Sequence, residues 1–267
     1  MPVSLAVAGN HAFVAAEAAG LRIVDITNPA QPREVGAFEG WTPITDVAVA
    51  GNRAYVTKGA GRALGVLDVT NPANPTLVGS VQLPGEANNV SVRDGYAFVA
   101  NGGYGLRVVD VADSAQPSIV GAIDTPGNAR AVTLSPDGRY AYVADWEAGV
   151  RVIAIVDAAH LAEIGFYDTP GLASGVAVAS NIVYVADQSR GLLILDVADP
   201  SHPVRIGELA TPGRAWSVAI AGSLAVVADG NAGVTFVDVS TPTQPVIVGS
   251  CATTSEARDV AFSAPYT

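Results

Sequence analysis

One seven-residue phrase, Gly-Leu-x-Val-x-Asp-Val, recurs along this 267-residue chain and constrains its fold more than any other feature. Full, shortened or altered copies begin at six glycines: Gly20, Gly65, Gly105, Gly149, Gly191 and Gly233. The aspartate position of successive copies is 42 to 44 residues apart, and Ala154 replaces the aspartate in the fourth copy. An internal period of this length indicates a repeat architecture in which each copy is one structural unit.

Each copy contains four short segments with the composition of β-strands. In the third copy these segments are residues 89–92, 96–100, 105–111 and 119–123. Val, Ile, Tyr and Phe dominate the segments, while Gly, Pro, Asn and Asp fill the gaps between them. No stretch of the chain shows helical periodicity. The sequence therefore predicts an all-β protein with four strands per repeat.

The predicted strands are apolar on both faces, so both faces must be covered by neighbouring sheets. Radial blades in a closed ring provide this cover and leave no exposed terminal sheet. We therefore expect a β-propeller of four-stranded antiparallel blades, with six complete blades. A β-solenoid is the structural alternative, but a period of about 42 residues fits a four-stranded blade better.

The domain prediction is a single propeller domain over residues 1–267. Seven segments have the pattern of a first strand, but only six segments each have the pattern of a second, third or fourth strand. Residues 257–267 are expected to open a further blade or to serve as a redundant inner strand. We expect this chain to be the six-blade part of a longer chain, and a seventh blade is possible in the full-length protein.

The repeat resembles the LVIVD repeat family, and residues 108–111 (VVDV) and 193–196 (LILD) carry the match. Residues 142–145 (YVAD) and 184–187 (YVAD) are similar to the related YVTN-type propellers. The resemblance implies a propeller, often in secreted or cell-surface proteins of prokaryotes, and it implies no particular activity. We therefore expect an extracellular or cell-surface location, although residues 1–4 lack the pattern of a signal peptide.

Composition and charge exclude several classes of partner. The formal net charge is −11 at pH 7, so the surface repels phosphate backbones and we expect no nucleic-acid partner. Anionic membrane surfaces are disfavoured for the same reason. No apolar run approaches the length of a membrane helix, so we expect no direct membrane insertion. Cys251 is the only cysteine, which rules out a disulfide within the chain.

The two faces of the expected ring differ in their loops. On one face, which we call the repetitive face, the turns after the third strands share one Asn/Asp-Pro sequence pattern, as in residues 28–32, 71–75 and 199–203. Loops on the other face vary and include all three tryptophans, which are enriched at binding hot spots. We predict ligand-binding residues on the variable face: Trp41, Asn88, Arg130, Trp146, Trp216 and Arg258. The alternative is that the tryptophan rings fill the space between blades.

Two sets of aspartates are candidates for a metal-binding or catalytic role. Asp145, Asp187 and Asp229 end their second strands at equivalent positions, where oxygen ligands on one rim could hold calcium. The alternative, which we favour, is that each forms a local turn, and we predict no other cofactor. The aspartate of the repeated phrase is expected to bond the adjacent turn and to have no catalytic role.

The leading functional hypothesis is a non-enzymatic binding or scaffold module for a protein, peptide or glycan ligand. One alternative is a hydrolase or lyase, with or without a metal, that uses carboxylates at the channel mouth. Its candidate residues are Asp46, Asp145, Asp187 and Asp259. Another alternative is an architectural repeat within a cell-surface protein. The sequence singles out no reaction, because one scaffold serves many functions.

Overall fold

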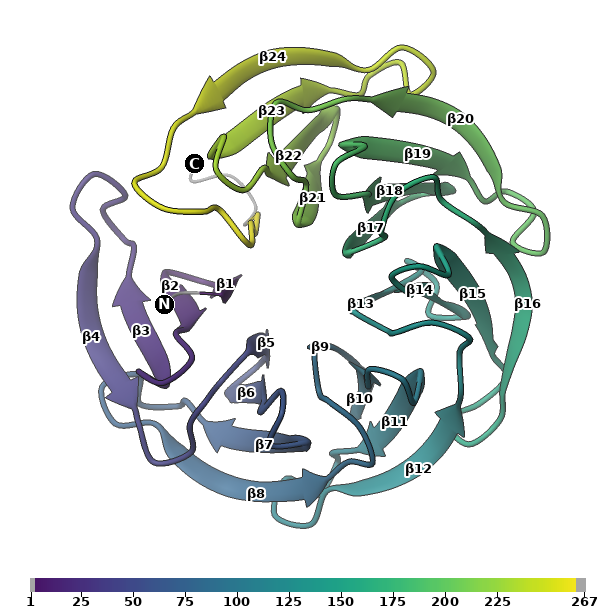
Figure 1. The fold of residues 1–267 in the computed structure, drawn as a ribbon. Helices are drawn as coiled ribbons and strands as arrows, with labels where there is room; N and C mark the ends of the chain where they lie inside the picture. Colours follow the sequence, from purple (N-terminus) through teal and green to yellow (C-terminus); the bar gives the residue numbers. More distant parts are fainter. Residues whose placement is uncertain (1–2, 263–267) are drawn as a thin grey trace.

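A computed structural model describes residues 3–262 of the chain as a ring of six four-stranded sheets around a central channel (Figure 1). The strands of each sheet follow one another in sequence order from the channel to the rim, and all pairs within the sheets are antiparallel. The fold is thus an all-β propeller with six blades, as the repeat predicts. The described residues form no helix that is long and apolar enough to cross a bilayer.

Blade 1 consists of β1 (Ser4–Ala8), β2 (His11–Ala15), β3 (Leu21–Asp25) and β4 (Arg33–Phe38). Blade 2 consists of β5 (Asp46–Ala50), β6 (Arg53–Thr57), β7 (Ala63–Asp68) and β8 (Thr76–Gln82). Blade 3 consists of β9 (Asn89–Arg93), β10 (Tyr96–Ala100), β11 (Leu106–Asp110) and β12 (Ser118–Ile123). Blade 4 consists of β13 (Ala131–Leu134), β14 (Tyr140–Ala144), β15 (Val150–Ile155) and β16 (Leu161–Tyr167). Blade 5 consists of β17 (Gly175–Ala179), β18 (Ile182–Ala186), β19 (Leu192–Asp196) and β20 (Val204–Leu209). Blade 6 consists of β21 (Ser217–Ala221), β22 (Leu224–Ala228), β23 (Val234–Asp238) and β24 (Val246–Cys251).

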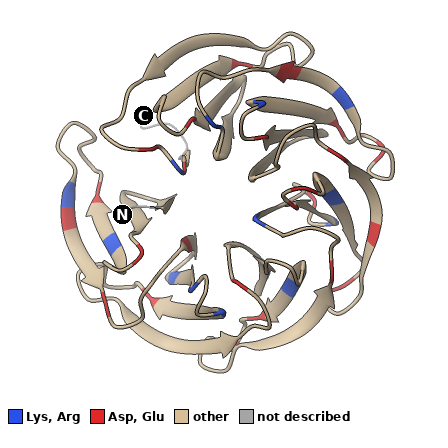
Figure 2. Cartoon of the chain, viewed as in Figure 1, with Lys and Arg blue, Asp and Glu red and all other residues tan. Residues whose placement is uncertain are grey.

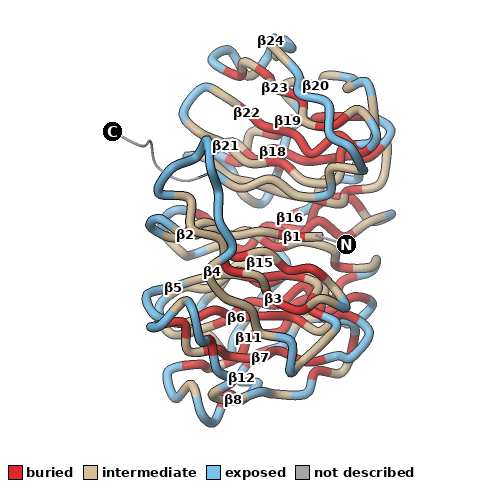
Figure 3. Tube along the Cα trace, turned by 90° about the vertical axis from the view of Figure 1, so that its left-hand side faces the viewer, coloured by how far each residue is buried: buried red, intermediate tan, exposed pale blue. Residues whose placement is uncertain are grey.

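Apolar side chains between neighbouring blades form the core. The described residues contain five buried clusters, which join blades 1 and 2, 2 and 3, 3 and 4, 4 and 5, and 5 and 6. Burial is greatest in the second and third strands, while the outer strands and the loops on both faces are exposed (Figure 3). This distribution explains why the repeated phrase is apolar on both sides of its strand, since blades 2 to 5 each pack against a neighbour on both faces.

The aspartate of the repeated phrase has the structural role expected for it. Asp25 accepts a hydrogen bond from the backbone N–H of Thr27 at 2.8 Å, and Asp68 accepts one from Thr70 at 2.8 Å. The equivalent aspartates of blades 3, 5 and 6 bond the residue two positions later in the same way. Each side chain therefore closes the turn that follows its third strand, and that turn lies on the repetitive face of the ring.

After β24 the chain turns inward and runs between blade 6 and blade 1 (Figure 1). We call residues 257–262 the tail segment. Ala257 makes an isolated antiparallel bridge with Gly230 of blade 6, and no strand is assigned to the rest of the segment. The remaining part of the predicted opening of a further blade, residues 263–267, lies outside the described residues.

Candidate functional site

The N-terminal ends of the innermost strands surround a cavity of about 480 Å³ at one mouth of the channel. The residue that precedes each inner strand lines it, and so does its counterpart in the tail segment: Val3, Thr45, Asn88, Arg130, Ser174, Trp216 and Arg258. The next residue in each segment lines it too: Ser4, Asp46, Asn89, Ala131, Gly175, Ser217 and Asp259. Trp146 reaches the cavity from the loop after β14. The cavity thus lies on the variable face.

Two arginine–tryptophan stacks stand at the cavity wall. The guanidinium of Arg130 lies 4.7 Å from the centre of the Trp146 ring, and that of Arg258 lies 5.3 Å from the centre of the Trp216 ring. Such stacking holds a guanidinium in a fixed plane and leaves its N–H edge available to a ligand. The buried Nε of Arg130 and the buried Nε1 of Trp216 have no hydrogen-bond partner in the described part of the chain.

Five of the six predicted ligand-binding residues meet at this cavity, but Trp41 does not. Asn88 lines it and donates from its side-chain amide to the carbonyl of Ala129 at 2.8 Å. Trp41 instead packs over Gly65, where an added Cβ would lie 2.9 Å from the ring, and stacks with the Lys58 ammonium at 5.3 Å. The Trp41 ring therefore fills space at the junction of blades 1 and 2.

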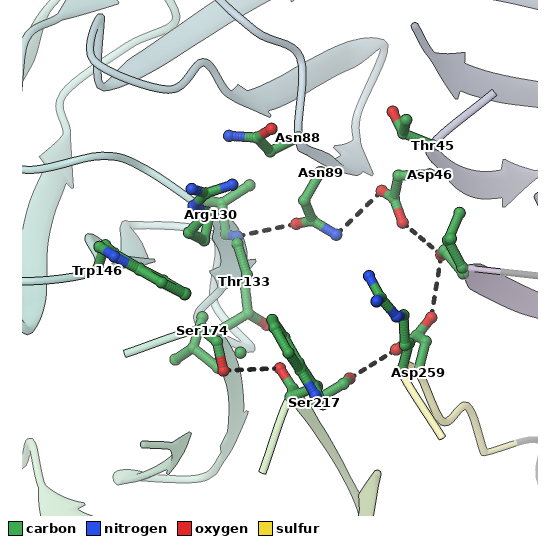
Figure 4. Close-up of a pocket in the computed structure, with 18 residues that line it drawn as sticks. Thr45, Asp46, Asn88, Asn89, Arg130, Thr133, Trp146, Ser174, Ser217 and Asp259 are labelled. Atoms are coloured by element: carbon green, nitrogen blue, oxygen red, sulfur yellow. Dashed lines mark hydrogen bonds between the residues drawn. The ribbon is translucent and has the colours of Figure 1, made fainter. Parts of the chain in front are cut away.

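Two carboxyl groups that line the cavity, those of Asp46 and Asp259, share one serine hydroxyl (Figure 4). The Ser4 Oγ lies 2.5 Å from the Asp46 Oδ1 and 3.0 Å from the Asp259 Oδ2. A hydroxyl carries a single hydrogen, so it can donate to only one carboxylate at a time. The second close contact is satisfied when the other carboxyl holds a proton and donates it to the serine oxygen. The group Asp46–Ser4–Asp259 is therefore built to retain one proton.

The electrostatics of the carboxyl pair agree with this geometry. Burial raises the pKa of Asp46 to about 7, and the nearby Asp259 adds to the rise, while hydrogen bonds from Ser4 and Val90 oppose it. Burial also raises the pKa of Asp259, against hydrogen bonds from Ser217, Leu5 and Ser4. Two carboxyls in one desolvated site cannot both ionise easily, so their protons are lost as a coupled unit.

Hydrogen bonds continue from this pair around the channel. The Ser217 hydroxyl donates to the Asp259 Oδ1 at 2.6 Å on one side. On the other side, the Asn89 amide donates to the Asp46 Oδ2 at 3.0 Å, and the Asn89 Oδ1 accepts from the Val132 backbone at 2.9 Å. The chain of bonds thus links the tail segment with blades 1, 2, 3, 4 and 6.

The three aspartates proposed as a calcium rim, which we call the rim aspartates (Asp145, Asp187 and Asp229), lie buried in separate blades. Asp229 accepts from Thr211 Oγ1 at 2.6 Å, from the Gly213 backbone and from Thr235 Oγ1, each of the latter at 3.0 Å. Asp145 and Asp187 likewise bond the loop that enters their blade, and burial raises the pKa of each. The described residues hold no group of three or more His, Cys, Asp or Glu side chains that could bind a metal.

These positions divide the four carboxylates suggested for catalysis into two kinds. Asp46 and Asp259 face the channel cavity, whereas Asp145 and Asp187 serve loops inside blades 4 and 5. The residues that sequence reasoning missed are Ser4, Asn89 and Ser217, together with Thr133 deeper in the channel. The repeat period contained a signal for the first three, because each falls at the same position of its copy as Asp46 and Asp259.

Charged residues are otherwise distributed over all six blades of the ring (Figure 2). Most arginines of the described residues that form ion pairs do so on blade surfaces, as in Arg22 with Glu39 at 2.6 Å and Arg53 with Asp68 at 2.7 Å. Arg258 pairs with Glu256 at 3.0 Å beside the cavity. The cavity lining thus brings groups of both charges together: Arg130 lies on the blade 4 side, whereas Arg258 lies next to Asp259 in the tail segment.

A family model described as the LVIVD repeat matches the chain six times. The matched residues are 3–39, 44–82, 84–125, 126–169, 170–211 and 212–253. Each match ends near the close of one blade, so the six matches correspond to the six blades. Among curated proteins, no sequence matches this chain at a significant level.

Solved structures with the same fold share little sequence with the chain. A Lactobacillus plantarum protein superposes with a TM-score of 0.85 at 18% identity, over 97% of this chain and 86% of that one. The periplasmic gluconolactonase of Pseudomonas aeruginosa gives 0.80 at 16% identity, over 96% and 86%. A functionally unknown protein from Desulfotomaculum acetoxidans gives 0.79 at 14% identity, over 94% and 83%. At these identities the similarity establishes the fold alone.

Proposed function

We propose that this chain, which belongs to the LVIVD repeat family, is a non-enzymatic binding module whose channel mouth takes a compact glycan with a carboxylate group. The observation that carries this proposal is the pair of arginine–tryptophan stacks that line the cavity, Arg130 with Trp146 and Arg258 with Trp216. A stacked guanidinium is already oriented, so a ligand carboxylate does not have to order it on binding.

The rest of the cavity favours a small hydroxylated ligand. Its volume of about 480 Å³ lies within the usual range for small-molecule sites. Asn88, Thr45 and Ser174 place amide and hydroxyl groups on the lining, where each also bonds a backbone carbonyl, and the carboxyl pair adds acceptor oxygens. In a chain of net charge −11, an arginine in this cavity with an unpartnered Nε favours an anionic group on the ligand. The gluconolactonase among the fold neighbours is compatible with a sugar-derived ligand at this type of channel.

Isothermal titration with D-glucuronate, D-gluconate and D-glucose tests the proposal. We expect saturable binding of at least one of the two acids and much weaker binding of glucose. Arg130→Gln should weaken binding of the acid at least about tenfold, in line with loss of a charge-assisted bond. The matched control is Arg139→Gln, since Arg139 stacks over Tyr140 at 5.4 Å on the repetitive face.

Two outcomes would contradict the binding proposal. The first is that neither acid binds the intact chain at millimolar concentration. The second is that Arg130→Gln binds the acid as tightly as the control Arg139→Gln and the intact chain do.

A second candidate function is hydrolysis or elimination by acid–base chemistry. The raised pKa values of the carboxyl pair in Asp46–Ser4–Asp259 favour it. A carboxyl whose pKa lies near neutrality can both accept and donate a proton at physiological pH. The test is hydrolysis of D-glucono-1,5-lactone, where water adds to the ester carbonyl and the ring oxygen leaves with a proton. Turnover above the spontaneous rate that Asp46→Asn abolishes would establish this function. Tight binding of the acid without turnover would leave the binding module as the function.

A further inference from the structure

The tail segment occupies the place that the inner end of a seventh blade would take. Within the ring, the loop after each second strand bridges the segment that enters the next blade, as Gln188 does with Ala215 and Trp146 with Ala173. Gly230 makes the same bridge with Ala257 of the tail segment. The segment therefore follows blade 6 in the way that each blade follows the one before it.

Side-chain hydrogen bonds repeat this relation on both sides of the segment. Asp46 of blade 2 accepts from Ser4 of blade 1 and from the Val90 backbone of blade 3. Asp259 of the tail segment accepts from Ser217 of blade 6 at 2.6 Å and from the Leu5 backbone of blade 1 at 3.0 Å. Ser217 and Leu5 hold the same positions in their repeats as Ser4 and Val90. The ring is thus divided into seven sectors, and six of them contain a complete blade.

The sheet faces that border the seventh sector lack the cover that their counterparts have. No apolar cluster of the described residues joins blade 6 to blade 1. Phe236 on blade 6 is only partly buried, whereas the equivalent Ile194 of blade 5 is fully buried. On blade 1, Val14 is partly buried, whereas the equivalent Val56 of blade 2 is fully buried. Two apolar faces therefore look into the same sector.

One glycine shows what kind of structure fits this sector. The fourth strands of blades 1 to 5 each carry a glycine that touches the turn after the third strand of the next blade. A Cβ at any of these glycines would lie 2.0 to 2.4 Å from a backbone carbonyl oxygen of that turn: Gly36, Gly79, Gly121, Gly165 and Gly207. The equivalent Gly249 of blade 6 would meet only the Phe236 side chain, at 3.8 Å. Blade 6 therefore keeps the contact surface for a following blade, and blade 1 does not fill it.

We propose that blades 6 and 1 form a docking slot for one further LVIVD-type sheet of three antiparallel strands. This sheet pairs with the tail segment, covers both apolar faces and rests the turn after its middle strand on Gly249. A second copy of the chain is a poor occupant, because all 24 described strands already belong to complete sheets. The proposal is independent of the ligand at the channel mouth.

The test supplies the missing sheet from the chain's own repeat. Residues 263–267 are replaced by a copy of residues 221–251, so that the tail segment continues as blade 6 does. The extended chain and its parent both carry Ser255→Gly, because the equivalent Gly213 lies so close to blade 6 that a Cβ would be 2.0 Å from the Asp229 carbonyl oxygen. We expect the extended chain to melt at least about 5 °C higher than its parent. A control extension, in which the copies of Val234 and Phe236 are serine, should give no rise.

Gly249→Ala provides an internal control that separates docking from a general effect of length. In the parent chain it should leave the melting temperature within about 1 °C, because open space surrounds the position. In the extended chain it should lower the melting temperature by several degrees, as Gly207→Ala should in both chains. Three results would overturn the proposal: no rise on extension, equal effects of Gly249→Ala in both chains, or sedimentation of the unextended chain as a dimer, which would make a second copy the occupant.

Discussion

The carboxyl pair predicts a specific pH dependence of stability, which Asp46→Asn should reduce. A pKa raised from 3.8 to about 7 means that the folded state holds this proton more tightly than the unfolded state does. The free energy of unfolding should therefore be highest below the unfolded pKa and fall as the pH rises toward 7. At 1.36 kcal/mol per pKa unit, the fall between about pH 4 and pH 7 is on the order of 4 kcal/mol.

Urea unfolding at pH 4.5, 5.5, 6.5 and 7.5, followed by tryptophan fluorescence, measures this fall. In Asp46→Asn the amide cannot ionise, and the Ser4 hydroxyl can donate to Asp259 while it accepts from the amide, so the fall should shrink to the part that comes from the raised pKa of the buried Asp259. The control is Asp137→Asn on the repetitive face. Hydrogen bonds from Ser135 and Arg139 lower the pKa of this exposed carboxyl, so its contribution is lost only on acidification below about pH 4. If Asp46→Asn keeps the full fall, the proton does not reside in the Asp46–Ser4–Asp259 group.

Four further changes test the roles assigned to particular side chains. Asp229→Ala should cost about 3 kcal/mol in urea unfolding, because it leaves three donors without an acceptor, whereas Asp238→Ala at a surface turn should cost far less. Trp41→Ala should lower stability by about 2 to 3 kcal/mol through lost packing over Gly65, yet leave titrations with sugar acids unchanged. Addition of calcium should leave the melting temperature unchanged, because the rim aspartates lie buried in separate blades and each already accepts a hydrogen bond from the loop that enters its blade. The exposed Cys251 should react with a thiol reagent in the folded protein without a change in melting temperature.

The scaffold could be predicted because its determinants recur in every copy. The turn aspartates such as Asp25 and Asp68 need only local sequence to find their partners two residues later. The four strand segments of a repeat pair in sequence order, so no long-range choice of partner has to be made. Six periods then give six blades, and the faces follow from the order of the turns.

The site was harder to predict because it depends on how the ring closes. Asp46 and Asp259 are far apart in sequence, and they meet only because the tail segment returns to blade 1. The sequence of a loop likewise does not show where a tryptophan ring in it will point. Trp41 and Trp216 both precede a first strand, but Trp41 lies five residues before the start of β5, in a loop with a cis Thr42–Pro43 bond. Trp216 directly precedes β21 and so faces the channel.

The inner position of the repeat explains how a symmetric scaffold supports an asymmetric cavity. Its seven occupants are Ser4, Asp46, Asn89, Ala131, Gly175, Ser217 and Asp259. The same backbone position accepts a carboxyl, an amide, a hydroxyl, a methyl group or only hydrogen, so the fold does not require a particular side chain there. The acidic members fall in the tail segment and blade 2, whereas Arg130 and Trp146 come from blade 4, so groups of both charges line one cavity of about 480 Å³. For the proposed carboxylated sugar, we expect the anion at Arg130 and the hydroxyls beside the Asp46–Ser4–Asp259 group.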